Sequence, residues 1–175
     1  STETPEPAEG SGGPEDGRYA RQELISWWEQ ERLMRSRVLV VGAGALGNEI
    51  VKNLALVGVG SVAVIDLDTV ENSNLARCVM FRDGDDGAAK APLLAERAKE
   101  MNPTIETWGF EGDVRHDVGL GTFMDADVVI GGLDNQEARL AVDERCWKTT
   151  TPWVDGAIEG LMGVMRVFVP PDSAC

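Results

Sequence analysis

Residues 38–47 read VLVVGAGALG, an apolar run followed directly by a glycine-rich turn. An unbroken run of β-branched residues and leucine is typical of a parallel strand that is covered on both faces. Residues 48–57 then carry apolar side chains at the spacing of an amphipathic helix. A strand, a glycine turn and a helix in this order can bind phosphate, because the helix N-terminus offers free N–H groups. The stretch therefore predicts a nucleotide-binding unit.

The chain beyond this unit alternates between the strand period and the helix period. With short loops between the elements, this alternation predicts an α/β fold: a Rossmann-like, doubly wound, mainly parallel sheet with helices on both faces. In the last helix we expect Leu140, Val142 and Cys146 on the inner face. The further elements that we expect are strands at residues 62–65, 105–110, 127–130, 153–154 and 164–169, and helices at residues 88–101 and 136–148.

The N-terminal segment has a different composition from the rest. Residues 1–17 hold three prolines, four glycines and five acids, with no base and no aromatic residue. Such a segment cannot bury enough apolar surface to offset the entropy of ordering, so we expect a disordered acidic tail. Residues 18–175 are expected to form one domain. From Tyr19 toward Arg35 the pattern predicts a single amphipathic helix whose two tryptophans pack against that domain.

Charge and cysteine content exclude several classes of protein. The 16 basic and 30 acidic residues give a formal net charge of −14, which argues against nucleic acid or an anionic membrane bound through bulk charge. Apolar runs stay well below the roughly 18–20 residues of a membrane-spanning helix, and we see no secretory signal. Cys78, Cys146 and Cys175 lie far apart, unlike a disulfide framework or a paired-cysteine zinc site. We expect a cytoplasmic protein that binds neither nucleic acid nor membranes.

The residues after the second strand narrow the choice of nucleotide. Asp66 ends that strand at about the 20-residue spacing where an acid binds ribose hydroxyls. Nicotinamide, flavin and ATP sites share this arrangement, so it leaves the nucleotide open. Asn74 and Arg77 are three residues apart, which places them on one face of a helical turn, and Lys90 follows near a helix start. Two cations exceed the needs of a dinucleotide and suit a triphosphate.

A further acid follows the fourth strand. Residues 131–135 read GGLDN, and ligands of a doubly wound sheet bind outside the carboxyl ends of its strands. We therefore expect Asp134 to face the same crevice as the glycine turn. A carboxylate beside a triphosphate suits Mg²⁺. The alternative is that Asp134 caps the helix that begins near Gln136.

In this order the motifs resemble the adenylation domain of the ThiF/MoeB superfamily, the ubiquitin-activating-enzyme-like adenylyltransferases. The resemblance runs from Arg18 to about Val169. It implies that the C-terminal carboxylate of a ubiquitin-like or sulfur-carrier protein ending in glycine attacks ATP, giving an acyl-adenylate and pyrophosphate. The carboxylate is already ionised at neutral pH, so no general base is required and His116 needs no catalytic role. The motifs that carry the resemblance are residues 18–22 (RYARQ), the glycine turn, residues 66–70 (DLDTV), residues 73–77 (SNLAR), Lys90 and residues 134–135 (DN).

Matching positions in the superfamily imply the role of each residue. Arg21 resembles an arginine that superfamily dimers insert into the partner subunit's nucleotide site, so the resemblance implies a homodimer. Arg21, Arg77, Lys90 and Asp134 are the implied catalytic set, and Asp134 is also the implied Mg²⁺ ligand. The implied nucleotide-binding residues are Gly42, Gly44 and Gly47 at the phosphates, Asp66 at the ribose, Asn74, Arg77 and Lys90 at the triphosphate, and Asn135 beside Asp134.

Two positions depart from the superfamily pattern. Many relatives have glutamine where this chain has Cys78, which we expect to be a small buried residue beside the nucleotide site. Many relatives also continue past the position of Cys175 into a cysteine-pair zinc segment. A structural Zn²⁺ is expected only if the chain continues beyond Cys175, and the sequence resembles the nucleotide half of such an enzyme.

Three other functions are compatible with parts of this sequence. The same fold can adenylate a peptide or a carboxylate on a modified tRNA base, which the charge of −14 disfavours only weakly for tRNA. A nicotinamide-dependent oxidoreductase explains the glycine turn and Asp66 but gives no joint role to Arg77, Lys90 and Asp134. A non-catalytic partner subunit predicts that these charges are lost, whereas they are retained.

Overall fold

A computed structural model describes residues 17–159 and 162–173. In this part of the chain six strands form one sheet in the order β3-β2-β1-β4-β5-β6. β1 to β5 are all parallel to one another, and β6 is antiparallel to β5. The bounds are β1 (Arg37–Val41), β2 (Ser61–Asp66), β3 (Glu106–Glu111), β4 (Val128–Gly131), β5 (Trp153–Glu159) and β6 (Met162–Phe168).

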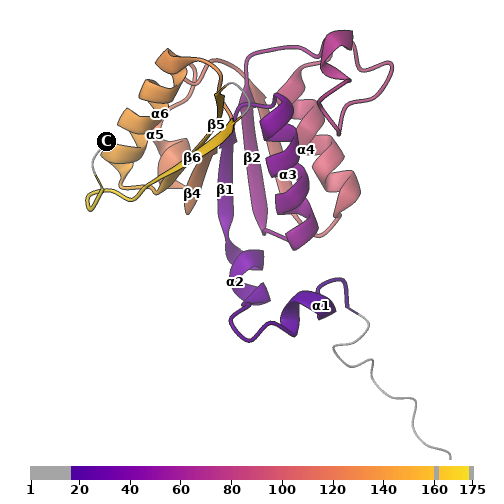
Figure 1. Cartoon of the computed structure of the whole chain (residues 1–175), viewed down its shortest axis with the longest axis vertical. Helices are drawn as coiled ribbons and strands as arrows, with labels where there is room; N and C mark the ends of the chain where they lie inside the picture. The colour runs from indigo at the N-terminus through magenta and orange to yellow at the C-terminus, as the bar shows by residue number, and fades with distance from the viewer. Residues whose placement is uncertain (1–16, 160–161, 174–175) are drawn as a thin grey trace, which may run out of the picture.

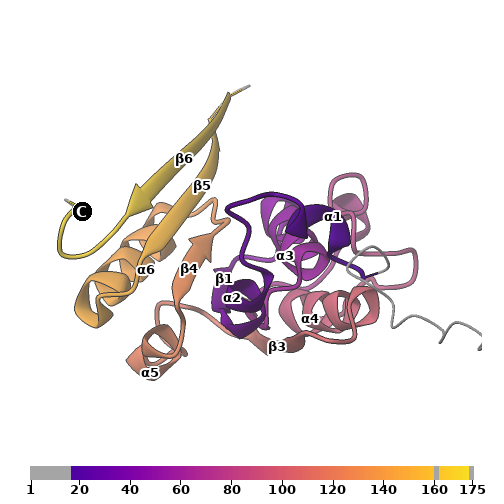
Figure 2. The same ribbon diagram turned by 90° about the horizontal axis from the view of Figure 1, so that it is seen from below.

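Helices cover both faces of the sheet, which confirms the predicted doubly wound fold (Figure 1). α3 (Ala45–Val57) and α4 (Lys90–Met101) pack on β1, β2 and β3. α5 (Leu120–Met124), which the sequence patterns did not predict, lies with α6 (Gln136–Thr149) on the opposite face, where α6 contacts β4 and β5. Figure 2 shows the two helical layers on either side of the strands.

The side chains of β1 explain why its sequence is apolar throughout. Successive residues of a strand point to opposite faces. Val38 and Val40 accordingly join the cluster beneath α3 and α4, while Leu39 and Val41 join the cluster beneath α5 and α6. All four are buried. A central strand with two covered faces has no position for a polar side chain.

The segment before β1 differs from the prediction of a single helix. It forms two short helices, α1 (Ala20–Glu23) and α2 (Gln30–Arg35), separated by residues 24–29. Gln30 is buried and donates from Nε2 to the carbonyl of Val57 at 3.0 Å, which ties the start of α2 to the end of α3. Trp27 is 73% exposed, so its expected packing is wrong, whereas Trp28 is partly buried and donates from Nε1 to Oε1 of Gln30 at 2.9 Å. Leu24, Ile25 and Trp27 are all exposed, so these apolar side chains gain little burial that would order the segment as one amphipathic helix. Local spacing does not contain this information.

In α6 one of the expected inner-face residues is wrong. Val142 and Cys146 are buried, whereas Leu140 is 63% exposed. At 100° per residue, positions 138, 142 and 146 lie on one face and position 140 lies nearly opposite. Ala138 is the buried residue in the first turn. The proposed tail, apart from Gly17, and Cys175 lie outside the described residues. Within the described ranges, no helix is both long and apolar enough to cross a membrane.

Candidate functional site

The two loops that the sequence analysis singled out meet at the switch point of the sheet. β1 and β4 are neighbours, and the chain leaves them toward opposite faces, into α3 and α6. The glycine turn, residues 42–47, therefore lies beside the loop after β4, residues 132–135. The N–H of Gly132 donates to the carbonyl of Val41 at 2.9 Å. Crevices for ligands form at such points because the outgoing chains diverge.

The three glycines of the turn are needed for different reasons. Gly42 has φ of +102°, and a Cβ there would lie 2.7 Å from the carbonyl oxygen of Gly132. A Cβ on Gly47 would collide with the carbonyl oxygen of Gly42. Gly44 has φ of −73°, and a Cβ on it would meet nothing within 4 Å. Gly42 and Gly47 thus allow the turn to form, and Gly44 faces open space.

The turn presents unpaired backbone donors at the start of α3. Gly44 is the N-cap residue and provides no side-chain cap. Among the described residues, none accepts a hydrogen bond from the N–H groups of residues 44–47. These donors and the positive end of the helix dipole favour an anion. The phosphate-binding role predicted for the turn stays a prediction that this geometry suits.

Asp66 holds the turn in place. Its Oδ2 accepts from the N–H of Ala43 at 2.6 Å, and its Oδ1 accepts from the N–H of Asp68 at 2.8 Å. Burial raises the pKa of Asp66, while the two N–H groups and Lys90 act in the opposite direction. Each carboxylate oxygen has a second lone pair, so the expected ribose contact remains compatible with these bonds.

Lys90 lies beside Asp66 and pairs with a residue that the sequence analysis did not single out. Its Nζ donates to Oδ2 of Asp68 at 2.9 Å, and its own N–H donates to the carbonyl of Asp68. Lys90 is 9% exposed, whereas the Asp68 side chain is 56% exposed. The spacing Asp66-Leu67-Asp68 was a signal for this pair, since alternate residues of an extended chain share a side.

The segment with Asn74 and Arg77 follows Asp68 in the chain, beyond the carboxyl end of β2. Asn74, in the 3₁₀ turn η2 (Asn72–Asn74), is buried, and its Oδ1 accepts from the N–H of Glu71 at 3.1 Å. Arg77 is exposed and donates to the carbonyl of Ser73 at 2.9 Å. Cys78 is buried, as expected. Burial raises its pKa, and the charges of Arg77 and Lys90 oppose that change, so both cations lie near this thiol.

The loop after β4 separates the roles of its two polar residues. Asn135 is the N-cap of α6, and its Oδ1 accepts from the N–H groups of Glu137 and Ala138 at 2.8 and 3.4 Å. The cap considered for Asp134 therefore belongs to its neighbour. Asp134 is exposed, and its carboxylate enters none of the ion pairs in the described part of the chain.

Arg139 anchors this loop, and spacing alone did not mark it. Its Nε donates to the carbonyl of Leu133 at 3.1 Å, and Nη2 donates to the same oxygen. Nη1 lies 3.6 Å from Oδ2 of the buried Asp155 on β5. The residue before Asp134 is thus tied to the neighbouring strand. Only the folded sheet brings Asp155 beside this part of α6.

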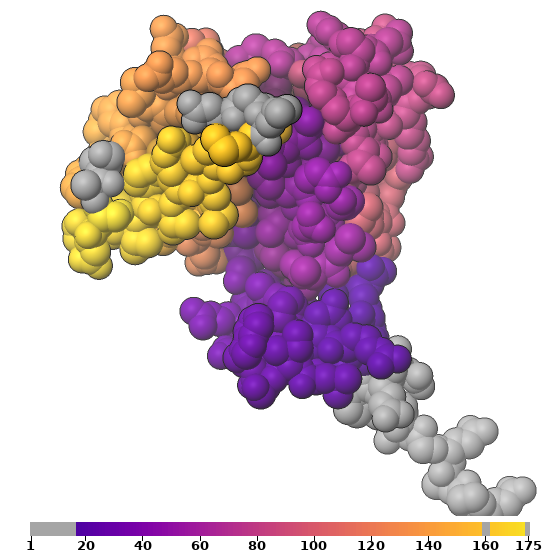
Figure 3. Space-filling view, in the orientation of Figure 1, coloured from indigo at the N-terminus to yellow at the C-terminus, as the bar shows by residue number. Residues whose placement is uncertain are grey.

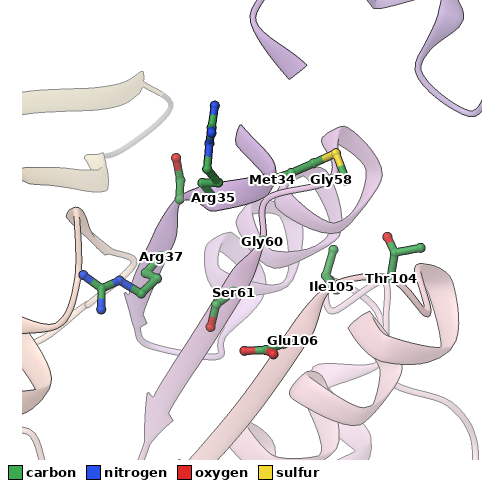
Figure 4. Close-up of a pocket in the computed structure, with 10 residues that line it drawn as sticks. Met34, Arg35, Arg37, Gly58, Gly60, Ser61, Thr104, Ile105 and Glu106 are labelled. Carbon is green, nitrogen blue, oxygen red and sulfur yellow. The ribbon is translucent and has the colours of Figure 1, made fainter. Parts of the chain in front are cut away.

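Arg21 lies at the other end of the molecule from the glycine turn. α1 and α2 lie beyond the amino end of β1 (Figures 1 and 3). The segment is anchored there, because Nδ2 of Asn102 donates to Oη of Tyr19 at 2.8 Å. A hollow of about 360 Å³ lies at this same end, and Arg37, Gly60 and Glu106 are among its lining residues (Figure 4). Within one chain, neither Arg21 nor this hollow belongs to the candidate site.

The sheet order, with its switch point between β1 and β4, and the glycine turn after β1 define an α/β domain of the Rossmann type. The chain belongs to the ThiF family, whose model matches residues 18–175. The predicted relationship to the ThiF/MoeB superfamily is therefore confirmed.

The chain is similar to named proteins of Caenorhabditis elegans and Bacillus subtilis. The chain is 35% identical over 154 residues to SUMO-activating enzyme subunit uba-2 of Caenorhabditis elegans, covering 87% of this chain and 26% of that protein. It is 34% identical over 164 residues to the sulfur carrier protein ThiS adenylyltransferase of Bacillus subtilis (strain 168), covering 91% of this chain and 49% of that one. The chain thus spans half or less of these relatives.

Among solved structures, a crystal structure of E. coli MccB with succinimide superimposes with a TM-score of 0.82 at 25% identity, over 90% of this chain and 49% of MccB. The structure of E. coli MccB with ATP gives a TM-score of 0.79 at 24% identity, which supports the fold.

Proposed function

We propose that this domain binds ATP and transfers its adenylyl group to the C-terminal carboxylate of a ubiquitin-like or sulfur-carrier protein that ends in glycine. The observation that carries the proposal is that three features meet at the carboxyl ends of β1, β2 and β4: the N–H groups of residues 44–47, for which no described residue is an acceptor, Lys90, and the loop of Asp134. Relatives named as a SUMO-activating subunit and a ThiS adenylyltransferase support the choice of carrier.

The reaction needs positioned positive charge more than it needs a base. A carboxylate oxygen of the carrier forms a bond to the α-phosphorus of ATP, and the bond from that phosphorus to the bridging oxygen of pyrophosphate breaks. The attacking carboxylate is already ionised at neutral pH. The barrier therefore depends on holding the two anions together and on neutralising charge that builds on the phosphates. Lys90, Arg77 and the N–H groups of the turn are suited to both tasks.

The residues present fit a magnesium ion that arrives with the nucleotide. The described residues contain no group of three or more His, Cys, Asp or Glu side chains that could hold a metal. Mg²⁺ in nucleotide sites is commonly held by one or two carboxylates together with phosphates and water. We propose that Asp134 supplies that carboxylate, where the ion would neutralise phosphate charge. The second half of the proposed zinc site would lie beyond Cys175, outside the described residues.

We further propose a homodimer in which Arg21 serves the partner subunit's site. The support is its position in α1, at the opposite end of the sheet from the glycine turn of its own chain (Figure 1). A cytoplasmic location completes the proposal. It is supported by the two described cysteines, Cys78 and Cys146, which are buried free thiols, as expected in a reducing compartment.

The test is carrier-dependent exchange between ATP and labelled pyrophosphate, with ubiquitin-like and sulfur-carrier proteins as substrates. The matched control is each carrier without its terminal glycine. We expect pyrophosphate exchange with the intact carrier and none with the carrier that lacks its terminal glycine. Exchange driven only by a free peptide, or by tRNA, would overturn the carrier assignment. Calorimetry with Mg-ATP and with NAD tests the nucleotide, and tighter binding of NAD would reject adenylation.

A further inference from the structure

A buried asparagine lies directly behind the glycine turn. Asn48, in the first turns of α3, is fully buried. Its Nδ2 donates to the carbonyl of Ala43 at 2.9 Å and to the carbonyl of Gly44 at 3.1 Å. Its Oδ1 accepts from the N–H of Met80 at 3.0 Å. A buried amide is costly unless it is paired, and here both donors and the acceptor have partners. Desolvation of this side chain is therefore compensated only in this one arrangement of the turn.

The two carbonyl contacts set the direction of the donors that the site uses. In a planar trans peptide the C=O and the following N–H point in opposite directions. With the carbonyls of Ala43 and Gly44 turned inward to Asn48, the N–H groups of Gly44 and Ala45 point away from it. These belong to the four turn N–H groups for which no described residue is an acceptor. The backbone N–H of residue 48 also donates to the carbonyl of Gly44, at 2.9 Å, so the peptide between Gly44 and Ala45 has a second support. Among the described residues only the Asn48 side chain donates to the carbonyl of Ala43, and Asn48 thus aims above all the N–H of Gly44.

The third contact joins two parts of the site that are 32 residues apart in sequence. Met80 ends the segment that begins at Asn74 and includes Arg77. The N–H groups of Arg77 and Cys78 both donate to the carbonyl of Asn74, at 3.0 and 2.9 Å, which makes this segment one compact turn. Through Met80, Asn48 therefore fixes the distance between the turn donors and the exposed arginine.

We infer that Asn48 is a positioning residue: it orients the phosphate-binding N–H groups of the turn and holds the Arg77 segment in register with them. The inference rests on the proposed function, since it assigns the aimed donors to the triphosphate of ATP. It predicts a larger effect on phosphate than on ribose. Asn48 and Asp66 bind the carbonyl and the N–H of Ala43 respectively, and among the described residues the Asn48 side chain forms no hydrogen bond to Asp66 itself.

The experiment compares ATP with adenosine, both titrated by calorimetry at a fixed Mg²⁺ concentration. Asn48→Leu keeps the side-chain volume but removes all three hydrogen bonds, and we expect ATP to bind about tenfold more weakly. Adenosine should bind with nearly unchanged affinity. Asn48→Ser offers a milder case, because a serine hydroxyl can still donate to the carbonyl four residues earlier, that of Gly44. Its ATP affinity should lie between those of the wild type and Asn48→Leu.

The matched control removes a buried hydrogen bond elsewhere. Thr151 is buried at the amino end of β5 and donates from Oγ1 to the carbonyl of Phe123 at 3.0 Å. Thr151→Val should lower the Tm and leave the ratio of the two affinities unchanged. A purely structural Asn48 would behave in the same way, with ATP and adenosine weakened equally, and that result would overturn the inference.

The inference and the proposed function fail in different ways. If the wild type binds ATP but no carrier drives pyrophosphate exchange, adenylation is rejected, and the ratio of ATP to adenosine affinity still decides the role of Asn48. A wild type that binds no ATP overturns both. Hydrogen exchange adds a direct readout in the free protein: the amide of Met80 should exchange faster in Asn48→Leu than in Thr151→Val. Equal rates would contradict the link between the two segments.

Discussion

At the scale of single residues, the glycines of the turn differ in whether they tolerate substitution by alanine. Gly44→Ala places a methyl group in open space at an ordinary φ, so the Tm should stay within a few degrees of the wild type. ATP should nevertheless bind more weakly, because the methyl group occupies the place where phosphate approaches. Gly47→Ala pushes a methyl group against the carbonyl of Gly42 and should cost about 1–3 kcal/mol of folding free energy.

Thermal melts and ATP titrations of the two glycine variants check this difference. Equal melting of both variants, or full ATP affinity in Gly44→Ala, would contradict it.

The cations permit a second prediction at this scale. Lys90→Ala and Arg77→Ala each remove a charge that we propose faces the phosphates, and each should lower the rate of pyrophosphate exchange about 100-fold to 1000-fold. Lys99→Ala is the matched control for Lys90, since Lys99 lies on the same helix and donates instead to the carbonyl of Ile105. It should leave exchange unchanged. Asp66→Ala should weaken nucleotide binding, because it loses the proposed ribose contact and the hydrogen bond that supports the turn at Ala43.

Exchange kinetics and melting curves are measured together for these variants. If the loss of exchange activity in Lys90→Ala were fully explained by a fall in its Tm, Lys90 would have a structural role.

At the scale of elements, an ionic contact fixes the loop after β3 against α6. Arg115 donates to both carboxylate oxygens of Asp113 and to Oε2 of Glu137 in the first turn of α6. Hydrogen bonds from Arg115 lower the pKa of Asp113 to about 2. A folded-state pKa below the ordinary 3.8 means that Asp113 stabilises the fold above pH 3.8. This contribution is lost as the pH falls from 3.8 through about 2.

We therefore expect Asp113→Asn to melt a few degrees below the wild type at pH 7, a modest effect because solvent screens the pair. The difference should shrink steadily below pH 3.8 and vanish below about pH 2. Melting curves over this pH range are the measurement, and a difference independent of pH would show that the ionised carboxylate is not the cause.

At the scale of the whole molecule, the proposed dimer makes a test by mixing possible. Arg21→Ala and Asp134→Ala should each be inactive as homodimers, because every shared site lacks one of the two residues. After random exchange of subunits at equal concentrations, about a quarter of all sites should carry both residues and regain activity. Pyrophosphate exchange before and after mixing is the measurement. No recovery despite demonstrated subunit exchange would mean that Arg21 does not act across subunits.

The agreement between predicted and observed bounds varies from one helix or strand to another. Five of the strands in the described part of the chain and the three long helices were predicted to within a few residues, because an apolar run of period 2 or 3.6 is local information. The fifth strand was predicted only at residues 153–154, whereas β5 extends to Glu159 in its pairing with β6. The segment before β1 was predicted wrongly, as one helix instead of α1 and α2. Whether this segment forms one helix or two depends on whether an apolar surface lies beside Trp27, and on the contact of Gln30 with the end of α3. Both are properties of packing that local spacing does not contain.

The sequence by itself determined the fold class, the ThiF relationship and the glycine turn, because each depends on residue types at short, fixed spacings. Tertiary structure alone decided which partner each site residue has. It paired Lys90 with Asp68, gave the helix cap to Asn135 instead of Asp134, and placed Asn48 behind the turn with Met80 as its third partner. These contacts join segments whose separation in sequence is unrelated to their separation in space, since the sheet order β3-β2-β1-β4 sets which strand ends are neighbours.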